Sequence, residues 1–159
     1  MISKLIPESR AVDIIRKLRK RGKKVVFTNG CFDIIHSGHA LYLESARRLG
    51  DFLVVGLNRD ESVRRLKGPG RPVMSFKERA TLLSLLIPVD LIVGFSEQTP
   101  LRLIRNLRPD VLVKGADYKI SDIVGAKEVA GWGGRVMRIK LVKGKSTSDL
   151  IRRLRGRIM

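Results

Sequence analysis

Both histidines of this chain lie in one short stretch, Thr28-Asn-Gly-Cys-Phe-Asp-Ile-Ile-His-Ser-Gly-His39. An apolar, β-branched run, residues 23–27, precedes it, and a helical pattern, residues 40–49, follows it. This order predicts a strand, a glycine-bearing turn and a helix that opens with two imidazoles. Gly30 lets the backbone approach an anion, and the helix N-terminus adds a partial positive charge. The alternative is an ordinary pair of surface histidines. The flanking strand and helix favour a phosphate-binding site.

Length and composition predict one domain over residues 1–159, with a basic N-terminal helix, residues 1–22, and a catalytic α/β core, residues 23–159. A chain of 159 residues can bury a sufficient core without disulfides or metals. We expect a cytoplasmic protein without membrane insertion, because no apolar run approaches the ~20 residues of a membrane span and no secretory signal opens the chain. Cys31 is the single cysteine, and it is expected to be a small buried spacer rather than a catalytic thiol.

The net charge of +18 is concentrated at the two ends of the chain. Residues 4–24 hold nine basic residues against two acidic ones, and residues 135–157 hold nine against one. Such an excess indicates an anionic partner such as a nucleotide, a phosphosugar, a nucleic acid or a membrane face, or simply a solvated basic surface. Aromatic residues make up only 5% of the chain, which provides few stacking platforms for nucleic acid. We therefore expect no specific nucleic acid partner.

Apolar β-rich segments alternate with helical patterns along the chain. The strands are predicted at residues 24–28, 52–57, 91–94, 111–114 and 135–139. The helices are predicted at residues 8–21, 38–49, 61–66, 76–86, 100–107, 123–130 and 148–155. Helix caps are predicted at Asp60, Ser75, Thr99 and Thr147. This alternation predicts an α/β protein with an open, doubly wound, parallel five-stranded sheet.

Polar residues cluster where the predicted strands end, at residues 29–39, 58–60, 115–118 and 143–148. Because ligands of such sheets bind beyond the carboxyl ends of the strands, these loops are expected to form one crevice. The loop at residues 67–72, Lys-Gly-Pro-Gly-Arg-Pro, is predicted to be flexible and to face phosphates. The Gly-x-Gly-x-x-Gly fingerprint is absent after the first strand and the P-loop pattern is absent throughout, so nicotinamide dehydrogenases and P-loop kinases fit poorly.

The polar residues favour displacement at phosphorus over other chemistries. No nucleophile–base pair is apparent, and a zinc site lacks a third soft ligand, so no metal-ligating residues are predicted. Fixed positive charge is available instead, from Lys67, Lys114, Lys143, Lys145, Arg71 and Arg79. Phosphoryl-type displacement needs mainly alignment and charge stabilisation, and a phosphate nucleophile needs no general base.

The stretch at residues 28–39 resembles the HxGH signature of the nucleotidyltransferase superfamily that includes the cytidylyltransferases. The resemblance continues through residues 54–60, 64–68, 71–73, 89–93, 99–100, 112–118 and 127–129. Together these segments resemble the adenylyltransferases of ADP-heptose synthesis, either stand-alone or as the second domain of a fused kinase–transferase. The HxGH signature is specific only to the superfamily, whereas Val113-Lys-Gly-Ala-Asp-Tyr118 is far more specific. The resemblance implies a Rossmann-like nucleotidyltransferase fold.

The resemblance implies that ATP and D-glycero-D-manno-heptose 1-phosphate give ADP-heptose and pyrophosphate, with Mg²⁺, for the lipopolysaccharide core. The expected catalytic residues are His36, His39 and Lys67. The expected nucleotide-binding residues are Asn29, Gly30, Cys31, Phe32, Gly38, Lys114, Gly115, Asp117, Ser146 and Thr147. The expected sugar-phosphate contacts are Asp33, Asn58, Arg71, Arg79 and Tyr118, with a structural role left open for Asp33. Family likeness alone also implies a homodimer.

The chain departs from the superfamily pattern before the last helix. An Arg-Thr pair that usually precedes the Ser-Thr motif is missing, and residues 141–145 occupy its place, with Lys143 and Lys145 as candidates for the missing charge. No kinase pattern precedes the core, so a separate enzyme is expected to phosphorylate the heptose. Two alternatives stay open: a cytidylyltransferase for glycerol phosphate or a similar polyol phosphate, and a basic nucleic-acid-binding module with steep salt dependence.

Overall fold

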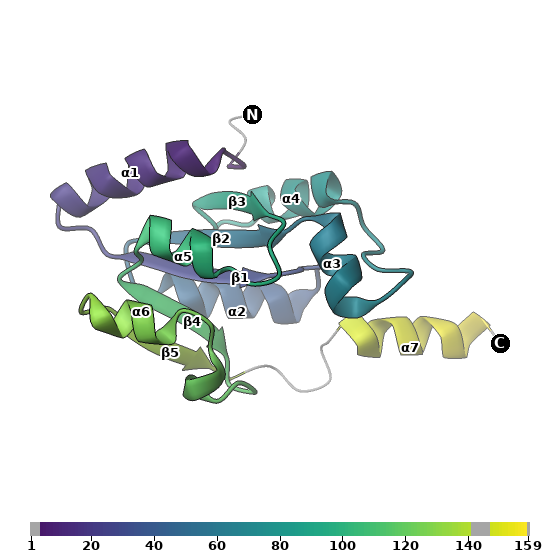
Figure 1. Ribbon diagram of the computed structural model, residues 1–159. Coiled ribbons are helices and arrows are strands. Elements are labelled where there is room, and N and C mark those ends of the chain that lie inside the picture. The colour runs from purple at the N-terminus through teal and green to yellow at the C-terminus, as the bar shows by residue number, and fades with distance from the viewer. Residues whose placement is uncertain (1–3, 141–146, 159) are drawn as a thin grey trace.

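The computed structural model describes residues 4–140 and 147–158, and it confirms the predicted α/β architecture. Five parallel strands form one sheet in the order β3-β2-β1-β4-β5, with helices on both faces (Figure 1). The strands are β1 (Val25–Gly30), β2 (Phe52–Asn58), β3 (Leu91–Phe95), β4 (Val111–Gly115) and β5 (Arg135–Ile139). The helices are α1 (Glu8–Lys20), α2 (Ser37–Arg47), α3 (Asp60–Lys67), α4 (Phe76–Leu85), α5 (Leu101–Leu107), the 3₁₀ turn η1 (Ile120–Asp122), α6 (Ala126–Gly131) and α7 (Thr147–Ile158).

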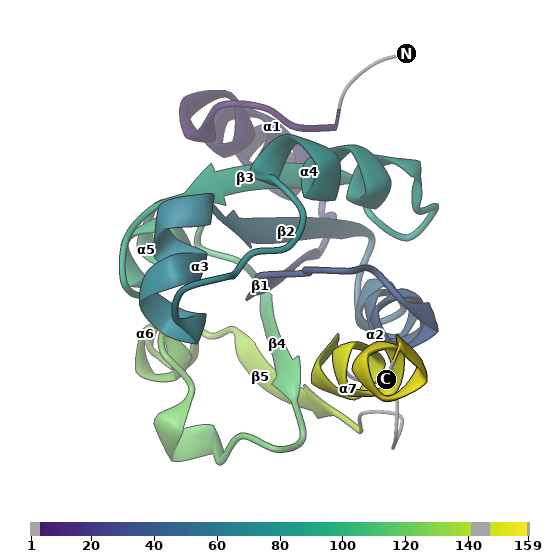
Figure 2. The same ribbon diagram turned by 90° about the vertical axis from the view of Figure 1, so that its right-hand side faces the viewer.

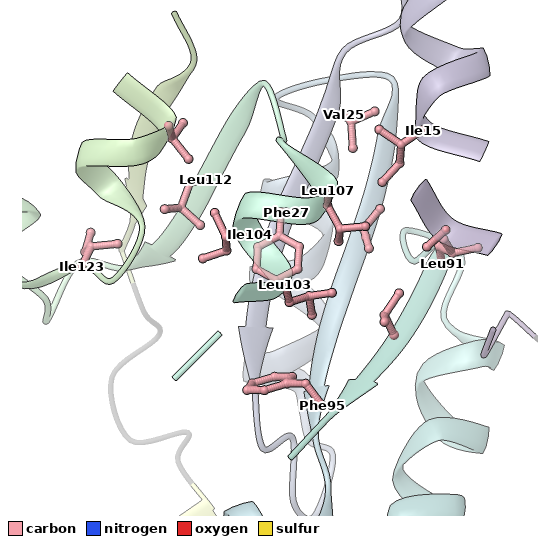
Figure 3. Close-up of a cluster of buried hydrophobic side chains, with 14 residues drawn as sticks. Ile15, Val25, Phe27, Leu91, Phe95, Leu103, Ile104, Leu107, Leu112 and Ile123 are labelled. Atoms are coloured by element: carbon pink, nitrogen blue, oxygen red, sulfur yellow. The ribbon is translucent and has the colours of Figure 1, made fainter. Parts of the chain in front are cut away.

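The central strands are apolar along their length because both faces of the sheet are covered. One core layer packs α1, α5 and α6 against the sheet around Phe27 and Ile104 (Figure 3). The other packs α2 and α4 around Leu43 and Leu83. The basic N-terminal helix is part of this core, since Ile15 of α1 is buried in the first layer. No helix within the described ranges is long and apolar enough to cross a membrane.

The strand order reverses next to β1, and this reversal decides where a ligand can bind. β1 pairs with β2 on one side and with β4 on the other. The connections that leave β1 and β4 therefore diverge at their carboxyl ends and open a crevice between them. The histidine-bearing stretch follows β1 directly, so the fold places it at this switch point.

Several predicted boundaries were wrong by one or more residues. β1 continues to Gly30 because Asn29 and Gly30 still pair with β2. The helix predicted at 123–130 begins later, at Ala126, as α6, and the 3₁₀ turn η1 lies before it. The break falls at Gly125, which has a φ of 87° and where a Cβ atom would lie 2.8 Å from Ile104 Cδ1. The left-handed backbone and the close packing both require glycine there, and such a residue cannot continue a helix.

The predicted cap at Ser75 is confirmed, because its side chain accepts from the Glu78 N–H in a full capping box. The caps predicted at Asp60 and Thr99 were wrong: the N-caps are Arg59 and Pro100. Asp60 is instead the first residue of α3, where its carboxylate accepts a hydrogen bond from Arg79. The local sequence around Asp60 carries no signal of this distant partner, so it could not show that the carboxylate binds Arg79 instead of capping the helix.

Candidate active site

A cleft of about 470 Å³ opens at the carboxyl ends of the strands, the side of the sheet that faces the viewer in Figure 2. It combines residues of the β1–α2 connection, the β4–η1 connection, the loop after α3 and the start of α7. Its lining includes the predicted residues Asn29, Gly30, Cys31, Phe32, Asp33, His36, Gly38, His39, Asn58, Lys67, Arg71, Lys114, Gly115, Asp117, Tyr118 and Thr147. The predicted convergence of separate loops on one crevice is therefore confirmed.

The two histidines are stacked on each other at the start of α2. Their ring centroids lie 3.9 Å apart with an interplanar angle of 23°, and the edge of the Phe32 ring packs against His39. His36 is the N-cap residue of α2, and its Nδ1 accepts a hydrogen bond of 3.1 Å from the Gly38 N–H. In a neutral ring this bond places the proton on Nε2, which is the donor that His36 can offer to a substrate.

Burial and the neighbouring His36 lower the pKa of His39 to about 4. The His39 ring is therefore neutral near pH 7 and can donate one N–H without adding a formal charge. Within the described part of the chain, its buried Nδ1 has no hydrogen-bond partner. A buried polar nitrogen without a partner is costly, so a ligand that bonded to it would recover that free energy.

The His39 pKa predicts a loss of stability in mild acid. The unfolded chain binds a proton on this ring below pH 6.5, whereas the folded protein binds it only near pH 4, so the free energy of unfolding falls as the pH drops through this window. The full contribution is up to about 3 kcal/mol. Urea unfolding between pH 7 and pH 4.5 measures it. His39→Phe is expected to lose distinctly less stability than the parent, and an equal loss in both proteins would contradict the assignment.

The turn that links β1 to the histidines has an unusual backbone. Phe32 and Ile34 have φ values of 47° and 51°, in the left-handed region that L-residues rarely occupy. Such strain persists only where the surroundings hold it, and it concentrates at functional sites. Among the described residues, no hydrogen bond uses the N–H groups of Phe32 and Asp33. Both residues line the cleft.

Asp33 holds this turn against the segment before α4. Its carboxylate accepts hydrogen bonds from Arg71 Nε at 2.7 Å and from the N–H groups of Val73 and Met74 at 2.8 and 3.0 Å. Burial by itself raises the pKa of Asp33, but these donors lower it more, and the net pKa lies below the ordinary value. The Thr147 hydroxyl donates to the Asp33 carbonyl oxygen at 2.7 Å. These contacts favour the structural role for Asp33.

Lys114 supplies a half-buried cation near the end of β4. Its Nζ lies 3.3 Å from the Asn29 carbonyl oxygen and 5.4 Å from the centre of the Tyr118 ring. Burial lowers the pKa of Lys114 to about 8, and Cys31 and Asp117 oppose that shift. No carboxylate in the described part of the chain forms an ion pair with this ammonium. Its partial removal from water is therefore costly, and a bound anion would stabilise it.

Arg79 lies behind the cleft and does not line it. Its side chain is 0% exposed, and its guanidinium donates to Met74 O, Cys31 O and Asp60 Oδ1. All these partners belong to the protein, so the described contacts of Arg79 lie within the protein where a substrate contact was expected. Asn58 lines the cleft, but its amide donates to Ser62 Oγ at 2.8 Å. Ser146, Lys143 and Lys145 lie outside the described residues.

Residues 27–153 match the sequence family described as cytidylyltransferase-like. The chain belongs to this family. It is 53% identical over 154 residues to the Bifunctional protein HldE of Paramagnetospirillum magneticum, covering 97% of this chain and 32% of that protein. The Bifunctional protein HldE of Syntrophotalea carbinolica is 56% identical over 145 residues, covering 91% of this chain and 30% of that protein. The chain thus spans about a third of the length of these relatives.

A solved structure of the lipopolysaccharide core biosynthesis protein from Thermoplasma volcanium is also similar, with a TM-score of 0.63 and 31% identity. The match covers 77% of this chain and 98% of that one. The family match confirms the prediction of a nucleotidyltransferase, and the fold agrees with the predicted Rossmann-like form.

The structure also adds cleft residues that the sequence analysis of this cytidylyltransferase-like domain missed, namely Tyr42, Leu66 and Ser148. The Tyr42 hydroxyl lies 2.8 Å from Thr28 Oγ1 and 3.3 Å from Val113 O, and burial raises its pKa to about 12. Tyr42 follows His39 by three residues, so helical periodicity could have placed both side chains on one face.

Proposed function

We propose that this domain transfers the adenylyl group of ATP to D-glycero-D-manno-heptose 1-phosphate, giving ADP-heptose and pyrophosphate for the lipopolysaccharide core. Family membership supports the reaction class, and the resemblance of residues 112–118 supports this acceptor. A solved relative that is described as a lipopolysaccharide core biosynthesis protein agrees with this pathway. A cytoplasmic location and a homodimer stay predictions.

The proposal depends on the kinds of side chain that line the cleft. The cleft places a stacked histidine pair, a half-buried lysine from β4 and the last residue of α3, Lys67, around one space at the sheet's switch point. Donors fixed in this way stabilise charge that develops on a phosphate without reorganising during the reaction.

In the proposed reaction, a phosphate oxygen of the sugar attacks the α-phosphorus of ATP, and the bond to the β-phosphate oxygen breaks. Pyrophosphate takes the electron pair of that bond. Since the attacking oxygen is already ionised, no residue has to act as a general base. His36 Nε2–H and His39 are proposed to donate to the α-phosphate and the leaving pyrophosphate, and Lys114 is proposed to hold the nucleotide by its charge.

Mg²⁺ is proposed to arrive as part of the ATP complex. Across the described residues, no three histidine, cysteine, aspartate or glutamate side chains lie close enough to form a metal cluster. Mg²⁺ commonly keeps several waters and binds through substrate phosphates, so this arrangement suits a nucleotide-borne ion. The proposal predicts no turnover in excess chelator.

A substrate panel tests the function. Pyrophosphate release is measured with ATP and with CTP against heptose 1-phosphate, glycerol 3-phosphate and related polyol phosphates. The proposal requires ATP with the heptose phosphate to give the highest kcat/KM. A preference for CTP with a polyol phosphate would replace it with the cytidylyltransferase alternative.

Lys67→Ala is expected to raise the KM for ATP and to slow turnover. Lys67 lines the cleft at the end of α3, and its positive charge is among those that oppose the raised pKa of Cys31. A charge brought over the phosphates when the loop closes would act on binding and on chemistry. Steady-state kinetics measure both, with Lys77→Ala on the exposed face of α4 as the control. Parental kinetics would show that Lys67 is only a solvated charge.

Loss of the basic α7 charges separates the enzyme from a nucleic-acid-binding module. We expect kcat to stay within about 2-fold when Arg152, Arg153, Arg155 and Arg157 are replaced together by alanine. The rate of substrate capture is expected, at most, to depend less on salt. Turnover and filter binding to duplex and single-stranded nucleic acid are measured across a salt series. If the four substitutions abolish a tight affinity for nucleic acid, and the protein adenylylates no sugar phosphate, the result supports the nucleic-acid-binding module instead.

A further inference from the structure

Two buried side chains of opposite charge bind the backbone of Met74, one at its N–H and the other at its carbonyl oxygen. Asp33 Oδ1 accepts from the Met74 N–H at 3.0 Å, and Arg79 Nε donates to the Met74 carbonyl oxygen at 3.0 Å. The side chains are 1% and 0% exposed, respectively. We call this arrangement the Met74 clamp.

The clamp joins the phosphate-facing turn to the segment before α4. Asp33 belongs to that turn, and Arg79 Nη1 also donates to the Cys31 carbonyl oxygen at 2.5 Å. The same Asp33 carboxylate binds the Val73 N–H and Arg71 Nε. The backbone of the turn is therefore tied to residues 71–74 by hydrogen bonds to buried charges, which are stronger than bonds between neutral groups.

Lys67 is the last residue of α3, and the loop that follows it is positioned by its two ends. Gly68 and Gly70 have φ values of 88° and 83°, and nothing lies within 4 Å of where their Cβ atoms would be. The middle of the loop therefore makes no close packing at these positions. One end is fixed by the clamp at Met74, and the other continues from α3, whose first residue, Asp60, accepts from Arg79 Nη2 at 2.7 Å.

We propose that Asp33 and Arg79 are positioning residues that set Lys67, at the end of α3, and the loop after it against the histidine pair, and this rests on the proposed function. Arg79 holds α3 and Met74 at once, so it fixes the elements on both sides of the loop. Asp33 fixes the far end to the turn from which the histidine helix begins. Neither side chain needs to touch substrate to affect the reaction.

The chemistry of the clamp makes conservative variants informative. Arg79→Lys keeps the charge but loses the fork that reaches three acceptors. Asp33→Asn keeps one oxygen but replaces the other by an NH₂ donor, which opposes the donors it faces. Both variants are expected to lower kcat/KM for ATP about 10–100-fold, since a misplacement of about 1 Å can cost 10²-fold.

A double-mutant cycle with Lys67→Ala provides the decisive kinetic test. If the clamp acts through the placement of Lys67, Arg79→Lys in the Lys67→Ala background should cost less than about 3-fold, because contacts that act through one another are not additive. If the losses in kcat/KM from the two substitutions multiply in full, the proposal is wrong. Such a result would indicate a general loss of folded protein, because that loss lowers activity equally in both backgrounds.

Arg47 and Asp90 provide a matched control pair away from the cleft. Arg47 Nε lies 2.8 Å from Asp90 Oδ2, and the same carboxylate accepts from the Leu53 N–H at 2.7 Å. Arg47→Lys and Asp90→Asn thus impose the same chemical changes on an ion pair that is partly exposed, with side chains 35% and 27% accessible. Their kinetics are expected to stay within about 2-fold of the parent.

Amide hydrogen exchange on the free protein tests the clamp without any substrate. The Val73 and Met74 amides are expected to be protected in the parent and to exchange at least about 10-fold faster in Asp33→Asn and Arg79→Lys, but not in the controls. Unprotected amides in the parent would overturn the clamp even if no variant folds. Faster exchange in the variants, with no adenylylation in the substrate panel, would sustain the clamp and reject the proposed acceptor.

Discussion

Replacing His39 by alanine is expected to lower kcat about 10²–10³-fold while the affinity for ATP stays within a few-fold. The ring is neutral because burial and His36 lower its pKa to about 4, and its buried Nδ1 has no partner among the described residues. A donor fixed in this way contributes most where charge develops in the transition state, and losing one such donor typically costs this much. Turnover is measured by pyrophosphate release and affinity by nucleotide titration of the free protein.

His36 requires a different variant because it also caps α2. Its Nδ1 accepts from the Gly38 N–H, so His36→Ala removes a cap worth roughly 1 kcal/mol as well as the imidazole. Asparagine is a good cap but has no imidazole. His36→Asn is therefore expected to keep the thermal stability of the parent and still lose about 10²–10³-fold in kcat. Full activity in folded His36→Asn or His39→Ala would refute the catalytic assignment.

Lys114→Met is expected to weaken ATP binding severely and to stabilise the nucleotide-free protein. Burial lowers the pKa of Lys114 to about 8 from an ordinary value of 10.5. Between these values the unfolded chain binds more protons, so the buried charge disfavours the folded state at neutral pH, by up to about 3 kcal/mol. Methionine keeps most of the volume without the charge. Thermal unfolding and nucleotide titration measure the two opposite effects.

The same pKa predicts how binding depends on pH. As the pH rises through about 8, free Lys114 loses its charge, and kcat/KM for ATP should fall, since this ratio reports ionisations of the free enzyme. Arginine stays charged in this range, so Lys114→Arg should remove the inflection while retaining part of the activity. An inflection near pH 8 that persists in Lys114→Arg would assign the effect to another group.

Much of the fold could be predicted because its signals are local. The continuous apolar runs at residues 25–27 and 111–113 indicated strands that are covered on both faces, and their alternation with helical periods indicated a parallel sheet. The HxGH stretch gave the site, since a strand, a turn and a helix N-terminus follow one another directly in the chain. The errors fell at boundaries such as Gly125, where a left-handed backbone and packing against Ile104 of a distant helix delay the start of α6 to Ala126.

The roles of the charged residues could not be predicted in the same way. In the sequence, Asp33 and Arg79 are charged residues in or near the site. Both were expected to contact substrate, and a structural role was left open for Asp33. Their burial depends on bonds across 38 to 48 positions of the chain, from Asp33 to Arg71 and from Arg79 to Cys31. No pattern within a single segment reports such partners.

The sequence by itself determined the order of strands and helices, the loops that carry polar residues and the family to which the chain belongs. Only the tertiary structure decided which of those polar groups face the cleft and which lie behind it, and how their protonation is shifted. Periodicity and turn chemistry act between neighbouring residues, so they can be read along the chain. Burial and pKa depend on what other segments bring within a few ångströms, as at His39 and Lys114, and are fixed only when the sheet assembles.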